Sequence, residues 1–205
     1  MQEFNETENK ILNAAAQVFL EQGKAGARTQ TIAELAGINK ALLHYYFRTK
    51  EKLYEIVTER IIRKVLGNVL GNLDETQEFE TWLPKFIHNY LYTIATNPMA
   101  SRFMLWELEA GGSRVAQIVR EVVNMKSLED NPFYRIINRA VQEGKIRPVE
   151  PEQLIISMIA LCVFPFVARP LLEKVIPGLD IRSESFLQSR EKAITEMILH
   201  GICPA

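Results

Sequence analysis

Between residues 24 and 52, the sequence concentrates side chains that can hold phosphate groups. Six basic and two acidic residues give this stretch a local net charge of +4, in a chain of 205 residues whose total charge is −1. Basic and tyrosine side chains donate hydrogen bonds to phosphate oxygens, and such contacts supply much of the affinity of proteins for nucleic acids. The basic residues are Lys24, Arg28, Lys40, Arg48, Lys50 and Lys52, and Tyr45 and Tyr46 lie among them.

Residues that could catalyse a reaction or bind a metal do not cluster in the sequence. The histidines His44, His88 and His200 are far apart, and no HExxH, GxSxG, CxxC or phosphate-loop pattern occurs. The two cysteines, Cys162 and Cys203, have apolar neighbours and are expected to be buried and reduced, as in a cytosolic protein. We therefore expect no catalytic residues, no metal and no cofactor.

The basic stretch begins on a predicted helix that ends in a glycine turn. Thr29 or Thr31 is expected to cap this helix, because threonine is a common N-cap residue. Gly37 follows the helix and can adopt the positive φ that a tight turn requires. The side chain of Ala33 is small enough to let a second helix approach closely. The expected inward positions of the helix are Ile32, Leu35 and Ala36.

A second, short helix is predicted to run from its N-cap Asn39 to about Tyr45, with Leu43 as its inward anchor. Thr49 is predicted to cap a third helix, which carries apolar residues at helical spacing as far as Ile61. Two helices joined by a glycine turn form either a helix-turn-helix, whose second helix can lie in a DNA groove, or an ordinary αα-hairpin. The local positive charge favours the first interpretation.

Residues 8–57 resemble the N-terminal domain of the TetR family of bacterial transcriptional repressors. The resemblance rests on three segments, ILNAAAQVFLEQG, TIAELAGINKALLHYYF and TKEKL, which stand in the order and spacing of the family. It implies an all-α fold, in which an N-terminal three-helix DNA-binding domain with a helix-turn-helix precedes a helical ligand-binding and dimerisation domain. We place these domains at residues 1–50 and 51–205.

The resemblance also implies roles for individual residues. The second helix of the motif would enter the major groove, where Lys40 can donate to a guanine and Leu42 can contact a thymine methyl group. Lys40 can equally be a solvated residue or a phosphate contact. Thr29 and Gln30 would touch the DNA backbone or a base edge. His44 stands where the family usually has tyrosine, and a histidine would make binding sensitive to pH. The expected DNA-binding residues are Thr29, Gln30, Asn39, Lys40, Ala41, Leu42, His44, Tyr45, Tyr46 and Lys50.

Apolar periodicity and breaking residues predict helices throughout the rest of the chain. We expect Pro84 in the first turn of a helix that starts near Trp82, and Ser113 as the N-cap of another. The apolar run 154–168 is too short for a membrane span, and the polar N-terminus is not a signal peptide. Hydrophobic content of 47% and charged content of 24% indicate a soluble globular protein, which we expect in the cytoplasm. The predicted helices cover about 50–70, 79–96, 98–110, 113–126, 132–143, 151–174 and 184–200.

The second domain contains enough aromatic side chains to line an apolar cavity. The resemblance implies that a small molecule binds there. The candidate polar anchors, if they point inward, are His88, Glu107 and Arg169. Aromatic residues of a helical bundle are also ordinary core residues, and the sequence leaves this alternative open. The candidate ligand-binding residues are His88, Tyr92, Phe103, Trp106, Glu107, Phe133 and Phe166.

The last two predicted helices resemble the dimerisation helices of the family. Their apolar content exceeds what one small core needs, although packing within a single chain is an alternative. A dimer with two-fold symmetry would read a palindromic operator. The expected interface residues are Leu154, Met158, Leu161, Ile194, Met197 and Ile198.

The sequence therefore predicts a ligand-responsive repressor that binds a palindromic operator as a homodimer and is released by a small apolar or amphipathic molecule. The alternatives are a ligand-dependent activator of the same fold, or a helical adaptor that binds proteins and not DNA. The expected partners are double-stranded DNA, a small-molecule effector and a second copy of the chain, with no membrane. The sequence does not identify the effector, the operator or the regulated genes.

Overall fold

The computed structural model describes residues 4–70, 74–125, 127 and 130–202. Within these residues the chain forms eleven α-helices and no strand, which confirms the predicted all-α fold. Contacts divide the chain into two compact units, Met1–Ile62 (unit 1) and Arg63–Ala205 (unit 2). The division falls inside helix α4, Lys50–Leu70, so this helix contributes to both units.

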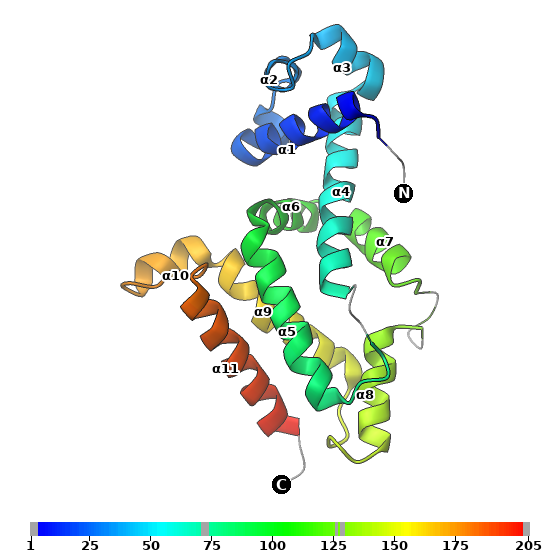
Figure 1. Cartoon of the computed structure of the whole chain (residues 1–205), viewed down its shortest axis with the longest axis vertical. Helices are drawn as coiled ribbons and strands as arrows, with labels where there is room; N and C mark the ends of the chain where they lie inside the picture. Colours follow the sequence, from blue (N-terminus) through cyan, green and yellow to red (C-terminus); the bar gives the residue numbers. More distant parts are fainter. Residues whose placement is uncertain (1–3, 71–73, 126, 128–129, 203–205) are drawn as a thin grey trace. The chain divides into compact units, whose positions relative to one another are not determined.

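Unit 1 gathers α1 (Glu6–Gly26), α2 (Thr29–Leu35) and α3 (Lys40–Phe47) around the first part of α4 (Figure 1). α1 begins with a capping box, in which the Asn5 and Glu8 side chains each accept a hydrogen bond from the other residue's backbone N–H. The buried side chains that hold these helices together include Phe19, Ile32, Ala33, Leu43, Phe47 and Leu53.

Two of the predicted helix caps of unit 1 are confirmed, and one is wrong. The Asn39 carboxamide oxygen accepts from the Leu42 N–H at 2.8 Å, and the Thr49 hydroxyl accepts from the Lys52 N–H at 3.1 Å. By contrast, α2 has Arg28 as its N-cap and no capping side chain, because Thr29 is already its first helical residue. The inward position predicted for Leu35 is also wrong, since this side chain is 49% exposed.

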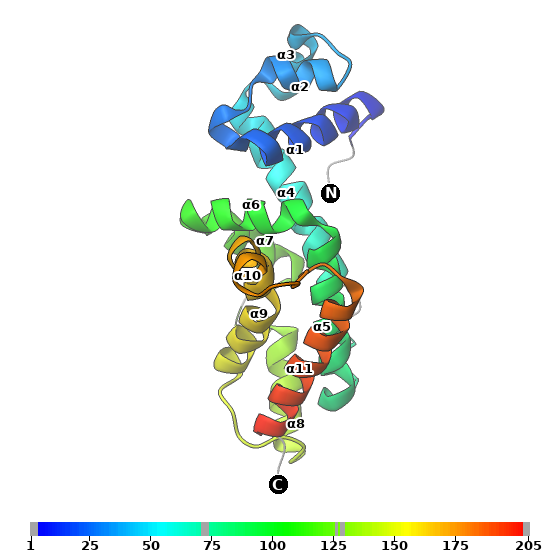
Figure 2. The same cartoon turned by 90° about the vertical axis from the view of Figure 1, so that its left-hand side faces the viewer.

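Unit 2 is a helical bundle in which α5, α9 and α11 lie side by side and α6 runs across their ends (Figures 1 and 2). Asn131 caps α8 by accepting from the Phe133 N–H at 3.0 Å, and the Ser183 hydroxyl accepts from the Phe186 N–H near the start of α11 at 3.2 Å. The helices are α5 (Phe79–Thr96), α6 (Pro98–Glu109), α7 (Ser113–Val122), α8 (Pro132–Gln142), α9 (Pro151–Val167), α10 (Arg169–Val175) and α11 (Glu184–Ile202).

The predicted bounds 79–96 of α5 are confirmed, but two details of the helix starts in unit 2 are wrong. The regular helix of α5 already begins at Phe79 and not near Trp82, so Pro84 lies inside the helix and not in its first turn. α7 is preceded by Gly112 in the left-handed conformation, at φ 71°, and Ser113 is its first helical residue without a capping bond.

An aromatic cluster fills the space between α5 and α8. Trp82 stacks on Phe86 with ring centroids 5.2 Å apart, and Phe133 meets both rings edge-on at 5.6 and 5.2 Å. All three side chains are buried. Close-packed rings at these distances leave no room for a ligand between them, so this cluster is core.

An arginine of α11 bonds to the backbone carbonyl that a buried proline leaves unpaired in α9. Pro165 lies inside α9 and has no N–H, so the carbonyl of Leu161, four residues earlier, loses its usual helical partner. The Arg190 guanidinium donates to this carbonyl at 2.8 Å. The neighbouring Cys162 is fully buried, as predicted, and burial raises the pKa of its thiol to about 12. Cys203 lies outside the described residues.

We expect Arg190 and Pro165 to be energetically coupled. Arg190→Met should lower the free energy of unfolding by about 1.5–3 kcal/mol, because it removes a charge-assisted hydrogen bond to an otherwise unpaired carbonyl. In a Pro165→Ala background the loss should be smaller, since the alanine would supply the missing backbone N–H. Urea unfolding of the two single variants and the double variant measures the coupling. Strictly additive effects would show that Arg190 does not replace the missing helical bond.

Within the described ranges, no single helix is long and apolar enough to cross a membrane. Among the described helices, only α9 and α10 taken together have the length and composition required for a membrane span, and these two helices are bent by 68° relative to each other.

Candidate DNA-binding surface and effector domain

The outer face of α3 carries the predicted DNA-reading residues. Leu43 and Phe47 are buried and anchor the helix, Tyr45 is exposed on the opposite side, and Lys40 and His44 are also exposed. Tyr45 is 77% exposed, which is unusual for an aromatic side chain without a partner surface. Ala41, the remaining exposed residue of this face, is small, so a base edge can approach the helix closely there.

The other predicted DNA-binding residues lie beside this face and are partly engaged. Asn39 uses its side-chain oxygen to cap α3, and the Gln30 amide donates to Glu34 in the next turn of α2 at 2.8 Å. Thr29, Leu42 and Tyr46 are half-buried, and the Tyr46 ring meets Tyr45 edge-on at 5.3 Å. The structure thus brings the predicted set together on α2, α3 and the start of α4.

Lys50 has a structural role that the sequence did not indicate. Its ammonium group donates to the carbonyl oxygens of Ala25 at 3.2 Å and Ala27 at 3.1 Å, where α1 ends. A positive charge at a helix C-terminus is favourable, because the unpaired carbonyls carry partial negative charge. One of the three N–H groups of the ammonium remains for another acceptor.

His44 is oriented by a backbone carbonyl. Its Nδ1 lies 2.9 Å from the carbonyl oxygen of Arg48, so Nδ1 carries the hydrogen and donates. In the neutral ring, Nε2 can then only accept, whereas the protonated ring presents an Nε2–H donor as well. The pH sensitivity expected for this position therefore has a definite sign, in which protonation strengthens an interaction with phosphate.

The ligand candidates on α5 lie at the surface and bridge to α11. His88 Nδ1 lies 2.8 Å from a Glu191 carboxylate oxygen, and the Tyr92 hydroxyl donates to Glu184 at 2.6 Å. The two rings stack at 4.1 Å. The hydrogen bond to Glu184 raises the pKa of Tyr92 to about 12. These contacts hold α5 and α11 together. The side chains of His88 and Tyr92 therefore do not point into an apolar interior.

The remaining ligand candidates lie on α6, α8 and α9. Phe133 belongs to the filled aromatic cluster between α5 and α8, and Phe166 is buried on α9. Phe103 is fully buried on α6, and its ring meets that of Trp106 at 5.4 Å. Glu107 is a buried carboxylate. The seven candidates therefore do not line one common cavity.

The Glu107 carboxylate is paired with a cation of the next helix. Arg114 Nε of α7 lies 3.4 Å from a carboxylate oxygen of Glu107 on α6. A buried charge needs such a partner, because an unpaired carboxylate in a protein interior is very costly. Glu107 and Arg114 thus place a polar group within the apolar part of unit 2.

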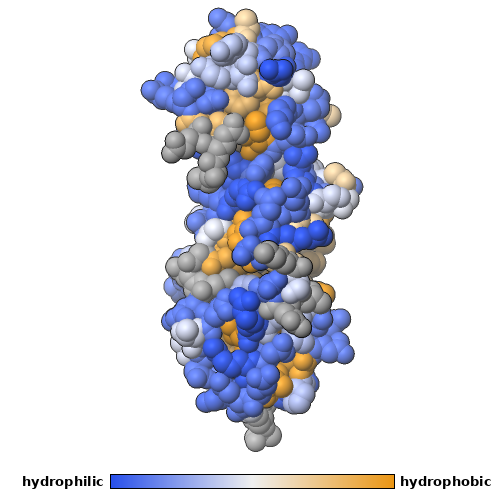
Figure 3. All heavy atoms as spheres, turned by 90° about the vertical axis from the view of Figure 1, so that its right-hand side faces the viewer, coloured by the Kyte–Doolittle hydropathy of each residue, from blue (hydrophilic) through white to orange (hydrophobic). Residues whose placement is uncertain are grey.

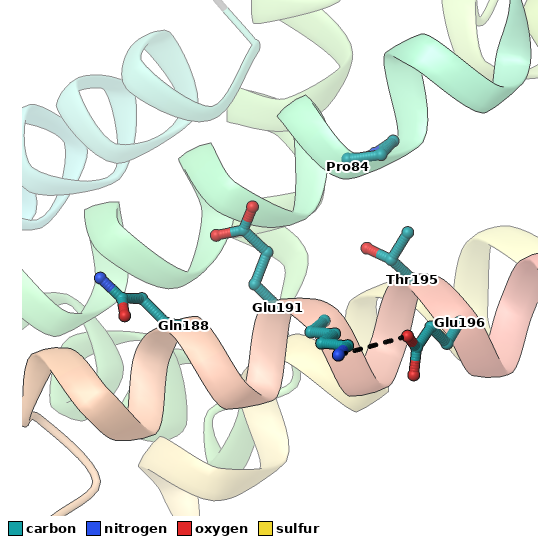
Figure 4. Close-up of a pocket in the computed structure, with 6 residues that line it drawn as sticks. Pro84, Gln188, Glu191, Thr195 and Glu196 are labelled. Atoms are coloured by element: carbon teal, nitrogen blue, oxygen red, sulfur yellow. Dashed lines mark ion pairs between the residues drawn. The ribbon is translucent and has the colours of Figure 1, made fainter.

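An open surface hollow of about 360 Å³ lies between α5 and α11 (Figure 4). None of its lining residues was predicted from the sequence to bind a ligand, because those of α11 are common polar residues at ordinary helical spacing. Figure 4 shows Glu191 and Thr195 pointing from α11 toward α5. The lining residues are Pro84, Gln188, Glu191, Lys192, Thr195 and Glu196.

The expected dimer interface is mostly misplaced. Leu154 and Met158 of α9 are buried in the subunit's own core, as are Ile194 and Ile198 of α11, so a second copy cannot reach them. Leu161 is half-buried, and Met197, at 58% exposure, is the exposed member of the set. The exposed apolar residues on the two helices are instead Ile156, Ile159, Phe164 and Met197, which we call the α9–α11 face.

Unit 1 contains a supporting helix, a glycine turn and a short helix with an exposed lysine, and unit 2 is a separate helical unit. This arrangement defines a helix-turn-helix DNA-binding regulator. Comparison with known proteins agrees. The sequence pattern described as "Bacterial regulatory proteins, tetR family" matches residues 11–57, and "Tetracyclin repressor-like, C-terminal domain" matches residues 80–198. The chain belongs to the TetR family and is a DNA-binding transcriptional regulator.

Individual relatives extend over nearly the whole chain. The transcriptional regulator RutR of Escherichia coli K12 is 30% identical over 194 residues, which cover 95% of this chain and 89% of RutR. The transcriptional repressor SCO4008 of Streptomyces coelicolor is 25% identical over 198 residues, which cover 94% of this chain and 95% of that protein.

Solved structures share the fold at low identity. A tetR-family regulatory protein from Rhodococcus RHA1 superposes with a TM-score of 0.74 at 18% identity, covering 98% of this chain and all of that one. The ketosteroid regulator KstR2 of Mycobacterium tuberculosis gives a TM-score of 0.70 at 17% identity, covering 99% of this chain and 98% of that one. At such identities the likeness supports the fold alone.

Proposed function

We propose that this protein is a repressor that binds a palindromic operator as a homodimer and is released by a small apolar or amphipathic effector. The observation that carries the proposal is the exposed surface of α3, where Lys40, His44 and Tyr45 are accessible while Leu43 and Phe47 anchor the helix in the core. The name of the relative SCO4008, a transcriptional repressor, supports repression over activation. DNA as the partner implies a cytoplasmic location.

Within unit 1 we divide the DNA contacts into two classes. Lys40, Ala41 and Leu42 open α3 and are the residues that read base edges, with Gln30 beside them on α2. Tyr45, Tyr46, His44 and Lys50 hold phosphates, and Thr29 and Asn39 support the helix starts. Reading residues set the sequence preference, whereas phosphate contacts set affinity for any DNA.

The α9–α11 face is the surface that we propose for the dimer. Its four side chains are large, apolar and exposed, and α9 and α11 lie next to each other on one side of unit 2 (Figure 2). The opposite side of unit 2 is mostly hydrophilic, with apolar atoms in separated areas (Figure 3). Association of two α9–α11 faces buries their side chains and creates a two-fold axis, which a palindrome requires.

We place the polar anchor for the effector at Glu107, the buried charged residue among those described in unit 2. Its partner Arg114 begins α7, and α7 is joined to the second part of α4 by an ion pair between Glu121 and Arg63. Since α4 also belongs to unit 1, movement of α7 can be transmitted to the DNA-binding helices. The effector shifts repression only if it binds one arrangement of these helices more tightly than the other.

Selection of bound DNA from a random duplex pool tests this function. We expect an enriched palindrome whose half-sites are bound with about 10³-fold or greater preference over unrelated DNA, and an affinity that falls steeply with salt. An enriched single half-site would contradict the dimer, and no enrichment would contradict operator binding and favour an adaptor. Tighter binding in the presence of effector would identify the alternative, a ligand-dependent activator of the same fold.

A further inference from the structure

The connection between α3 and α4 is a strained γ-turn centred on an arginine. Arg48 has φ 55° and ψ −60°, and the Thr49 N–H donates to the Phe47 carbonyl two residues earlier at 2.6 Å. This hydrogen bond and these angles define the form of γ-turn that is rare and strained for residues with a side chain. Glycine would adopt the same turn without the clash of a Cβ.

Folding alone does not explain an arginine at this position. The turn needs only a short connection between α3 and the Thr49 cap of α4, which glycine supplies at lower conformational cost. Within the described residues, no carboxylate or other acceptor binds the Arg48 guanidinium. A strained backbone conformation is usually retained in a protein only where the side chain at that residue has a function.

The position of Arg48 indicates what this use is. Along α3 the exposed residues fall at 40, 41, 44 and 45, and Arg48 directly follows the helix as its C-cap. Arg48 is itself exposed, and its carbonyl is fixed by the hydrogen bond from His44 Nδ1 at 2.9 Å. The exposed cations of Lys40 and Arg48 therefore stand at the two ends of α3.

We propose that Arg48 is an additional DNA contact, which binds a backbone phosphate at the C-terminal end of α3 and is held in place by the strained turn. The guanidinium matches a phosphate through two parallel N–H donors. The proposal rests on the proposed operator binding and adds a positioning residue to it. Strain in the turn is retained because arginine at this point increases the affinity for DNA.

Three substitutions of Arg48 in the full-length chain distinguish the effect of its charge from the effect of the strained backbone turn. Arg48→Gly removes both, Arg48→Ala removes the charge but keeps a Cβ, and Arg48→Lys keeps a charge and a Cβ. Arg60→Ala serves as the matched control, because Arg60 is another exposed arginine of unit 1, on α4. The probe is a mixed-sequence duplex of about 30 base pairs, titrated at salt concentrations from about 50 to 300 mM.

The variants should change stability and affinity independently. Arg48→Gly should raise the melting temperature by about 2–4 °C and yet weaken binding, with the salt slope reduced by about 1 per subunit. Arg48→Ala should lose the same affinity without gaining stability. Arg48→Lys should stay near wild type in both respects, and Arg60→Ala should bind at least as well as Arg48→Lys.

Two binding results and one stability result would overturn this inference while leaving operator binding intact. One is an Arg48→Gly variant with the affinity and salt slope of the wild type, and the other is an Arg60→Ala variant that loses as much affinity as Arg48→Ala. An unchanged or lower melting temperature for Arg48→Gly would also overturn it, because the turn would then carry no strain. A wild-type chain that shows no salt-dependent binding would instead refute the proposed function, and this inference with it.

Discussion

Ile156→Glu is expected to convert a dimer into a monomer at micromolar concentration and to lower operator affinity by about 100-fold or more. Ile156 is 60% exposed on α9, so glutamate there can be solvated in the monomer without disturbing the subunit core. In a two-fold interface the substitution occurs twice, and each carboxylate loses its water on association. Each half of the dimer then has to bind its half-site alone.

Leu108→Glu is the control for this substitution. Leu108 lies on α6 and is 57% exposed, so it matches Ile156 in exposure and chemistry but lies outside the α9–α11 face. Light scattering coupled to size-exclusion chromatography should find a dimer for the wild type and for Leu108→Glu, and a monomer for Ile156→Glu. A dimeric Ile156→Glu variant that binds operator normally would place the interface elsewhere.

Features determined by a few neighbouring residues were predicted well from the sequence. The start of α4 and the caps at Asn39 and Thr49 depend on side chains that bond to backbone groups three positions away. The glycine turn at Gly37, with φ 69°, is of the same kind. Local sequence signals are therefore sufficient to locate the helix-turn-helix.

Features that depend on which side of a helix faces the core were not predictable in this way. α9 is apolar on nearly all sides, so its sequence does not distinguish the buried Met158 from the exposed Ile156. The roles of Arg190 and Lys50 were missed for a related reason, since each side chain binds carbonyls more than twenty residues away in sequence. Composition likewise does not specify spatial proximity, so it did not indicate that His88 and Tyr92 bond to Glu191 and Glu184 of α11.

Lys50→Met is expected to weaken both the fold and DNA binding, whereas Lys40→Ala should affect DNA binding alone. Methionine keeps most of the apolar length of the lysine side chain but loses the charge-assisted hydrogen bonds to Ala25 and Ala27. We expect the free energy of unfolding to fall by about 1.5–3 kcal/mol. Lys40 is exposed, and its replacement should change stability by less than about 0.5 kcal/mol.

The two variants should also differ in how DNA binding changes. The remaining N–H of the Lys50 ammonium is directed by its two carbonyl partners, so its loss should weaken binding to all duplexes to a similar degree and flatten the salt dependence. Loss of Lys40 should alter the preference among operator variants, because that side chain can reach base edges. Binding is measured well below both melting temperatures, so that unfolding does not contribute. Lys50→Met with wild-type stability would refute the anchoring role, and indistinguishable binding by the two variants would refute the separation of phosphate contacts from reading contacts.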